Sequence, residues 1–132
     1  MAELTEISGK VRQYMKEHEE EFLGQFRHLH QHPELSYKEK NTTAYLVATA
    51  YIKKKLESWG IEILDIGLET GVVGLLKGGK EGPCIALRAD IDALPVLEES
   101  TSEYPSQNKG VMHACGHDTH MASLLGAAQI LA

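Results

Sequence analysis

The start of the chain alternates apolar and polar residues with the period of an α-helix. Between Leu4 and His30 apolar side chains recur at steps of three and four residues: Leu4, Ile7, Val11, Met15, Phe22, Phe26 and Leu29. This spacing predicts a long amphipathic helix, either continuous or broken where the pattern skips one turn at His18. Pro33 lacks an amide donor and disfavours helical geometry in the residue before it, so the helix ends before Pro33. We expect solvated or capping roles for three histidines near this end, which do not all share a face: His28, His30 and His32.

A second helical pattern covers residues 37–59. Its apolar stripe comprises Ala44, Ala48, Ile52, Leu56 and Trp59. The S-x-x-E sequence at residues 36–39 is typical of a capping box, in which both side chains satisfy free amides of the first turn. Gly60 is a natural stop, so we expect a helix from about Tyr37 to Trp59.

After Gly60 the pattern changes to short apolar runs bounded by glycine. The runs predict three strands, at Ile61 to Ile66, Val72 to Lys77 and Cys84 to Ala89. Their short connections favour an antiparallel meander. Within the third run, we interpret Cys84 as a small core residue.

The last part of the chain combines a polar loop, a histidine-rich stretch and an apolar helix. Residues 97–110 are polar and predict a loop, whereas Met121 to Ala132 is apolar on nearly every side and predicts a helix that its neighbours cover. The chain stops without glycine, asparagine or a basic last turn, as if cut inside an element. The expected fold is therefore α/β, with two long helices, a three-stranded largely antiparallel unit, a metal-ligand loop and a further helix.

Composition and charge exclude several classes of protein. The 132 residues are 42% hydrophobic and 24% charged, which argues against wholesale disorder and suffices for one modest core. The net charge of -6 comes from interspersed acids and bases, so we expect neither nucleic acid nor an anionic membrane as a partner. The chain has no signal-peptide pattern, no bilayer-length apolar run and only two isolated cysteines, so we expect a cytoplasmic protein.

Residues 112–120, MHACGHDTH, gather metal-binding side chains more densely than any other stretch. Cys115 and His117 are two residues apart, so in an extended segment they point to one side, with His113 behind them. Once the chain turns helical, His117 and His120 share a face. Thiolate and imidazole together suit zinc and its first-row neighbours. A histidine-rich loop with one ordinary buried cysteine is the alternative interpretation.

Acidic residues stand on either side of the predicted loop. Asp90 and Asp92 leave an apolar strand together with Arg88, and charges there are costly to bury unless they are paired or used. Being two apart, the two aspartates face one side of an extended chain. Glu98 and Glu99 precede the histidine-rich stretch and fall in the loop, so we expect them to be solvated.

Two motifs together resemble a known family. The sequences RADIDALP at residues 88–95 and GVMHACGHDTH at residues 110–120 resemble those of the dinuclear metal amidohydrolases. These enzymes include hippurate hydrolases, N-acyl-amino-acid amidohydrolases and plant auxin-conjugate hydrolases. The resemblance runs from about Phe22, through residues 27–35, into residues 124–128. It implies that the chain is the N-terminal fragment of a zinc-peptidase-like catalytic domain.

The resemblance also assigns roles to individual residues. It implies that Cys115 and His117 bind metal and that Asp92 orients the metal site through its contact with a ligand. Asp90 stands where related peptidases have a metal-binding histidine. It is given a supporting role together with the remaining polar residues of the second motif: His113, Asp118 and His120. The implied cofactor of the parent enzyme is a pair of divalent ions, zinc, manganese or similar.

The implied reaction is hydrolysis of the amide bond of an N-acyl amino acid or related conjugate. In such enzymes the metals activate a water molecule, and a glutamate serves as general base. Family members are several times longer than residues 1–132, which we therefore interpret as a single partial catalytic domain. The paired glutamates, two further metal-binding histidines, the lid or dimerisation domain and the C-terminal catalytic segment are absent from it. We expect this chain alone to be inactive, since Cys115 and His117 make a poor site unless His113, His120 or a second copy completes it.

Two other functional classes stay open. The chain could be a truncated, non-catalytic metal-binding or interaction module, or a globular domain in which Cys115 and the histidines only pack. For the catalytic-domain fragment alone, an exposed sheet edge and an apolar helix would favour a homo-oligomer.

Overall fold

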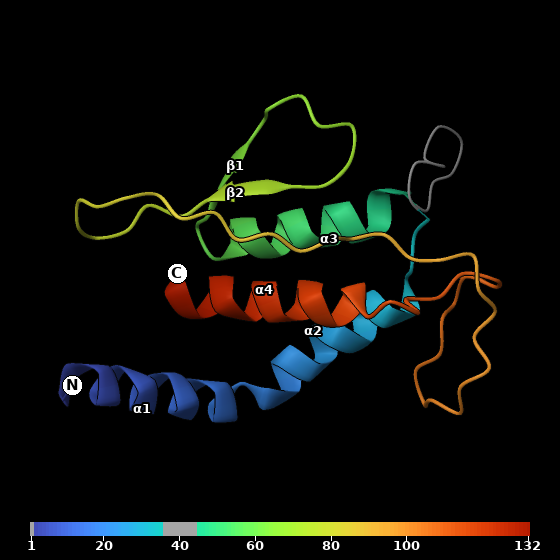
Figure 1. The fold of residues 1–132 in the computed structure, drawn as a ribbon, viewed down its shortest axis with the longest axis horizontal. Helices are drawn as coiled ribbons and strands as arrows, with labels where there is room; N and C mark the ends of the chain where they lie inside the picture. Colours follow the sequence, from blue (N-terminus) through green and yellow to red (C-terminus); the bar gives the residue numbers. More distant parts are fainter. Residues whose placement is uncertain (1, 36–44) are drawn as a thin grey trace.

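The computed structural model describes residues 2–35 and 45–132, and within them four helices accompany one two-stranded antiparallel sheet (Figure 1). The elements in chain order are α1 (Ala2–Glu17), α2 (Glu19–Gln31), α3 (Tyr45–Ser58), β1 (Glu62–Leu64), β2 (Val73–Leu75) and α4 (His117–Leu131). The predicted mixed α/β architecture is confirmed. The capping box at residues 36–39 and the predicted helical residues 37–44 lie outside the described residues.

The first predicted helix is broken at the residue where the apolar pattern skips a turn. His18 has φ -113° and ψ 18°, outside the helical region, and its carbonyl accepts the amides of Glu21 and Phe22 at 3.0 and 3.1 Å. It therefore separates α1 from α2 and caps the second helix through its backbone. α2 ends at Gln31, which confirms that the helix stops before Pro33.

Helix α4 lies between α2 and α3 and carries the centre of the core (Figure 1). The buried cluster consists of Leu29 from α2 with Met121 and Leu125 from α4. The stripe predicted for α3 packs against this cluster through Ile52 and Leu56, with Trp59 just after the helix. Most of α4 is accordingly buried or half-buried, as its apolar composition predicts.

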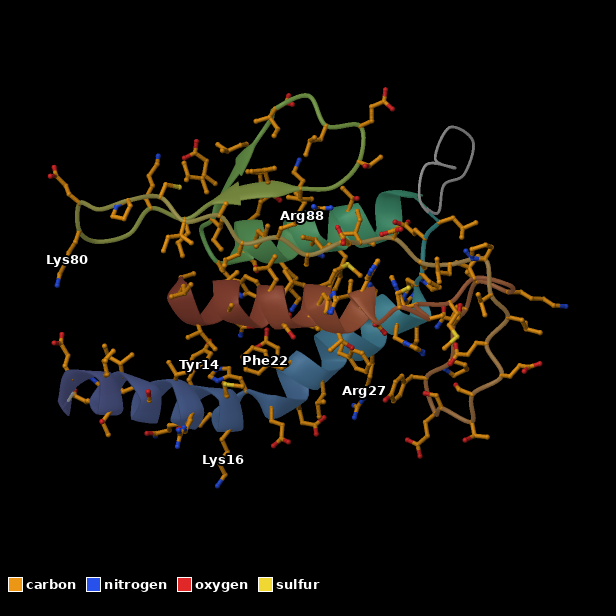
Figure 2. The ribbon with its side chains drawn as sticks, in the orientation of Figure 1. Tyr14, Lys16, Phe22, Arg27, Lys80 and Arg88 are labelled. Atoms are coloured by element: carbon orange, nitrogen blue, oxygen red, sulfur yellow. The ribbon has the colours of Figure 1, made fainter. Side chains whose placement is uncertain are left out.

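Polar and aromatic side chains fix how α4 lies against the first two helices. Gln25 donates a buried hydrogen bond to Gln129 at 2.9 Å, and Gln129 donates to Glu21 at 2.9 Å. Figure 2 shows Tyr14 and Phe22 on the side that faces α4, whereas Lys16 and Arg27 point away from it. The apolar stripe predicted for the start of the chain is only partly buried, since Leu4, Ile7 and Met15 of α1 remain exposed.

The strand prediction is right for two runs and wrong for the third. β1 and β2 pair antiparallel, with Ile63 opposite Gly74. Residues Cys84 to Ala89 do not form a strand, and Cys84 is exposed instead of buried in the core. The physical reason is that an apolar run becomes a strand only where another backbone satisfies its amides and carbonyls, and no described segment pairs with this run. Its two largest apolar side chains are left open to solvent, with Ile85 at 79% and Leu87 at 62% exposure, whereas Ala89 at its end packs against the core.

Among the described residues, no helix is long and apolar enough to cross a membrane.

Candidate metal centre

Short backbone pairings bring the two sequence motifs together. Leu94 and Met112 form an antiparallel bridge in which each amide donates to the other's carbonyl, at 2.9 and 3.0 Å. Beside it, the amide of Ala93 donates to the carbonyl of Glu34 at 2.7 Å. Because the pairing is antiparallel, the residues after Met112 return alongside those before Leu94. The second motif therefore lies next to Asp92.

Gly116 turns the chain from this bridge into α4. Its φ of 80° and ψ of 21° lie in the left-handed region, where a side chain is strained and glycine is not. Its carbonyl accepts the amides of Thr119 and His120 at 3.1 and 3.2 Å. The predicted helical turn after Gly116 is confirmed, and the rings of His117 and His120 stack with centroids 5.8 Å apart.

Asp92 holds the ring of His117 from one side. Nδ1 of His117 lies 2.8 Å from the backbone carbonyl oxygen of Asp92 and 3.1 Å from its carboxylate. A carbonyl oxygen only accepts hydrogen bonds, so Nδ1 must carry the proton. In the neutral ring the lone pair is then on Nε2. A metal-binding histidine has this arrangement, with its second nitrogen held by a carboxylate or carbonyl.

Cys115 and His113 lie on different sides of the turn. The amide of Gly116 donates to the carbonyl of His113 at 3.1 Å, which bends the chain between them. Cys115 is exposed, whereas His113 is only 4% exposed and neither ring nitrogen has a hydrogen-bond partner. Burial is the main cause of a lowered pKa for His113, which favours the neutral ring. Charge on His117 also contributes to the lowered pKa of His113, so the two rings lie within electrostatic reach of each other.

The supporting residues differ in their surroundings. Asp90 is exposed and forms an ion pair with Arg88 at 2.6 Å. Asp118 is buried, and one of its carboxylate oxygens accepts the amide of Thr119 at 2.8 Å. His120 is exposed beside His117.

The structure adds a buried cluster that sequence reasoning missed. Nδ1 of His30 donates to Asp118 at 2.6 Å, and Nε2 donates to Glu98 at 3.2 Å. The three side chains are only 12%, 4% and 5% exposed, in the order His30, Asp118, Glu98. The predictions that His30 and Glu98 are solvated or capping residues are therefore wrong, whereas Glu99 is exposed as predicted. No local pattern could have found this cluster, because its members are 68 and 88 residues apart.

Hydrogen bonds shift the ionisation of this cluster. Burial of the ring is the largest influence on His30 and opposes protonation, but the hydrogen bonds to Asp118 and Glu98 outweigh it and raise the pKa of His30. The hydroxyl of Ser100 and the amide of Ser106 donate to Glu98 and lower the pKa of its carboxyl. Both shifts favour a cationic imidazole between two carboxylates.

The other two histidines of α2 have local roles. Nδ1 of His32 donates to the carbonyl of His28 at 2.7 Å, which confirms a capping role at the helix end. The ring of His28 stacks between His32 and Tyr51.

The donor set fits part of a metal site. His117 directs one lone pair away from Asp92, and Cys115 offers an exposed thiol two residues away. Within the described ranges, no three histidine, cysteine or acidic side chains converge closely enough to hold an ion. A catalytic zinc site needs three protein ligands, so the two residues fit such a site without completing it.

The chain is similar in sequence to members of one peptidase family. The model of peptidase family M20/M25/M40 matches residues 86–132, which include both motifs. The chain is 54% identical over 113 residues to N-acetyl-L-cysteine deacetylase of Bacillus subtilis (strain 168), covering 86% of this chain and 26% of that protein. It is 49% identical over 127 residues to thermostable carboxypeptidase 2 of Saccharolobus solfataricus, covering 96% of this chain and 31% of that protein.

A solved structure supports the same relationship. The crystal structure of a dinuclear metal-binding peptidase of the M20 family from Bacillus subtilis superimposes with a TM-score of 0.79 at 45% identity. The match covers 88% of this chain and 31% of that one. The chain thus spans between a quarter and a third of the length of these relatives.

Proposed function

Since the chain belongs to peptidase family M20/M25/M40, we propose that it supplies the first metal ligands of an enzyme that hydrolyses the amide bond of N-acyl amino acids or related conjugates. The observation that carries the proposal is the contact between His117 and Asp92, which leaves Nε2 for a metal near the exposed Cys115. The relative named for deacetylation of N-acetyl-L-cysteine supports this substrate class.

Each residue of the proposed site has a distinct task. Cys115 and His117 bind metal, and Asp92 fixes the tautomer and the direction of the His117 ring. His113, Asp118 and His120 support the turn that carries these ligands, and Asp90 remains a solvated neighbour paired with Arg88. Bound divalent ions, which we propose to be zinc or manganese, would polarise the scissile carbonyl and lower the pKa of a coordinated water.

The 132-residue chain on its own is proposed to bind metal weakly and to hydrolyse nothing measurable. Two ligands are fewer than a catalytic zinc site uses, and the general base of the family is not among the residues assigned here. The exposed Ile85 and Leu87 favour self-association, so we also propose a homo-oligomer.

A non-catalytic metal-binding module is the second candidate function. The incomplete convergence of ligands among the described residues favours it. The two candidates differ in one result: a module binds metal tightly and stoichiometrically as the short chain, whereas the fragment of an enzyme needs further ligands.

The test combines metal content with hydrolysis. Elemental analysis of the purified chain is followed by assays on N-acetyl and N-benzoyl amino acids with added zinc or manganese. Little metal and no turnover are expected. Turnover by this chain would contradict the proposed incompleteness, and one tightly bound ion per chain without turnover would favour the module.

Cobalt(II) titration tests the ligands directly. In a Cys84→Ser background, binding should produce a thiolate-to-cobalt charge-transfer band that is lost in Cys115→Ser and in His117→Ala. Both cysteines are exposed, so either thiol could bind cobalt. The Cys84→Ser chain controls for this, because it loses one exposed thiol and should still show the band. A band that survives Cys115→Ser would overturn the ligand assignment.

A further inference from the structure

The buried His30 connects three parts of the chain that surround the proposed ligand His117. It is the second-last residue of α2, Asp118 belongs to the first turn of α4, and Glu98 belongs to the loop after the RADIDALP motif. Asp118 is the immediate neighbour of His117 in sequence. One imidazole ring therefore links the end of α2 both to the beginning of α4 and to the loop.

From this connection we propose that His30 is a positioning residue for the metal site, acting through Asp118 on the direction of the His117 ring. The inference rests on the proposed role of His117. It adds to that role a residue from a different helix, far from both sequence motifs.

The carboxylate of Asp118 is fully engaged. One oxygen accepts the amide of Thr119 at 2.8 Å, and the other accepts Nδ1 of His30 at 2.6 Å. Its side chain is only 4% exposed, and a buried carboxylate without a partner is costly. If His30 no longer donates, Asp118 must turn towards water, and the first turn of α4 must move with it.

Movement of that turn would reach His117 directly. Successive residues of a helix point about 100° apart, so Asp118 faces α2 while His117 faces Asp92. The contact of Asp118 with His30 thus sets the rotation of the first turn about the helix axis. The same rotation decides whether Nδ1 of His117 stays 2.8 Å from the Asp92 carbonyl. A metal site tolerates only small changes in the direction of a ligand ring, so a rotation of this turn would weaken metal binding.

Two conservative variants separate the two bonds of His30. In His30→Asn the side-chain amide nitrogen occupies the position of Nδ1, so the bond to Asp118 is kept and the bond to Glu98 is lost. In His30→Gln the side-chain amide nitrogen occupies the position of Nε2, so the bond to Glu98 is kept and the bond to Asp118 is lost. Both variants lose one buried hydrogen bond and the imidazole ring, so they are matched in their general effect on stability.

Cobalt(II) affinity in the Cys84→Ser background is the first measurement. His30→Gln should weaken it by about tenfold or more, as loss of a group that orients a ligand does, whereas His30→Asn should retain most of it. Urea unfolding should show similar losses of stability for both variants. Equal cobalt affinities in the two variants would overturn the proposal, because His30 would then act through stability alone.

The second measurement needs no metal. Nitrogen-15 chemical shifts of the His117 ring report its tautomer, and the bond to Asp92 places the proton on Nδ1. We expect this tautomer in the starting chain and in His30→Asn, and a mixture in His30→Gln. An unchanged tautomer in His30→Gln would overturn the positioning role even if the chain binds no cobalt. If the His117 tautomer changes as expected but cobalt(II) produces no thiolate band in the starting chain, only the ligand assignment would be contradicted.

Asp118→Asn provides the same test should His30→Gln fail to fold. The amide oxygen can still accept the Thr119 amide, while the contact with His30 loses its carboxylate. The His117 tautomer should again become mixed. An unaltered Nδ1 proton in this variant would equally overturn the proposal.

Discussion

Nδ1 of His117 lies 2.8 Å from the carbonyl oxygen of Asp92, although the two residues are 25 positions apart in sequence. The Asp92 carboxylate lies 3.1 Å from the same nitrogen. Two acceptors therefore share one ring proton, and the carbonyl alone suffices to define the tautomer. The carboxylate adds a second acceptor that holds the ring in this orientation, with the opposite nitrogen left for a metal.

The first prediction concerns this carboxylate. Asp92→Asn keeps the size and the backbone carbonyl but removes the charge, so divalent-metal affinity should fall by about tenfold. Cobalt titration in the Cys84→Ser background measures the loss. Asp90→Asn is the matched control, because Asp90 is exposed and pairs with Arg88 instead of a histidine. Equal effects of the two substitutions would mean that only the general charge of the motif matters.

The second prediction concerns the turn at Gly116. Gly116→Ala should lower the free energy of unfolding by about 1 to 2 kcal/mol, because its φ of +80° is unfavourable for any side chain. No atom lies within 4 Å of the added methyl group, so the cost comes from the backbone alone. Urea unfolding measures it.

Gly24→Ala is the control of opposite sign for this turn. Gly24 is an exposed residue inside α2, also with open space around it, and alanine there should stabilise the chain by up to about 1 kcal/mol. Destabilisation by both substitutions would show that the left-handed turn is not the cause.

The third prediction is a pH dependence of stability from His30. Its pKa is raised in the folded chain, so its stabilising contribution is complete below the unfolded value of 6.5 and is lost as pH rises through the folded value. The difference in unfolding free energy between the starting chain and His30→Gln should therefore shrink as the pH rises above 6.5 and through the folded value.

The opposite effect of His113 falls in a different pH range from that of His30. The pKa of His113 is lowered by burial, so its contribution is present above 6.5 and is lost as pH falls. The charge of His30 contributes to this lowering, so the His113 contribution does not cancel in the difference. It changes below pH 6.5, however, whereas the His30 contribution is lost above pH 6.5. A difference that grows on raising the pH would contradict the assigned ionisation of the His30 cluster.

Local features of the fold could be predicted from the sequence because each has a local physical cause. The missing apolar residue at His18 coincides with the break between α1 and α2. Pro33 sets the end of α2, and Gly60, with φ +75°, follows the end of α3. The antiparallel pairing of β1 with β2 follows from the short connection between them.

Features that depend on distant partners could not be predicted. The apolar run at residues 84–89 has the composition of a strand, but composition does not specify a neighbouring backbone. His30 and Glu98 have the sequence context of solvated residues, and only the return of α4 past α2 encloses them around Asp118. The metal-binding motif could be predicted only in part. Its turn into α4 follows from Gly116, whereas the contact of His117 with Asp92 depends on the bridge between Leu94 and Met112.

The last prediction uses the two cysteines as internal controls for each other. Both thiols are exposed, so an alkylating reagent should modify both when metal is absent. Zinc should slow modification of Cys115, because a metal-bound thiolate is a weaker nucleophile and is partly covered by the ion. Cys84 has no histidine partner in the proposed site and should react at an unchanged rate. Mass spectrometry of the digested protein measures both rates in one sample, and in His117→Ala the protection of Cys115 should disappear. Equal protection of both thiols would show that zinc binds cysteines here without a defined site.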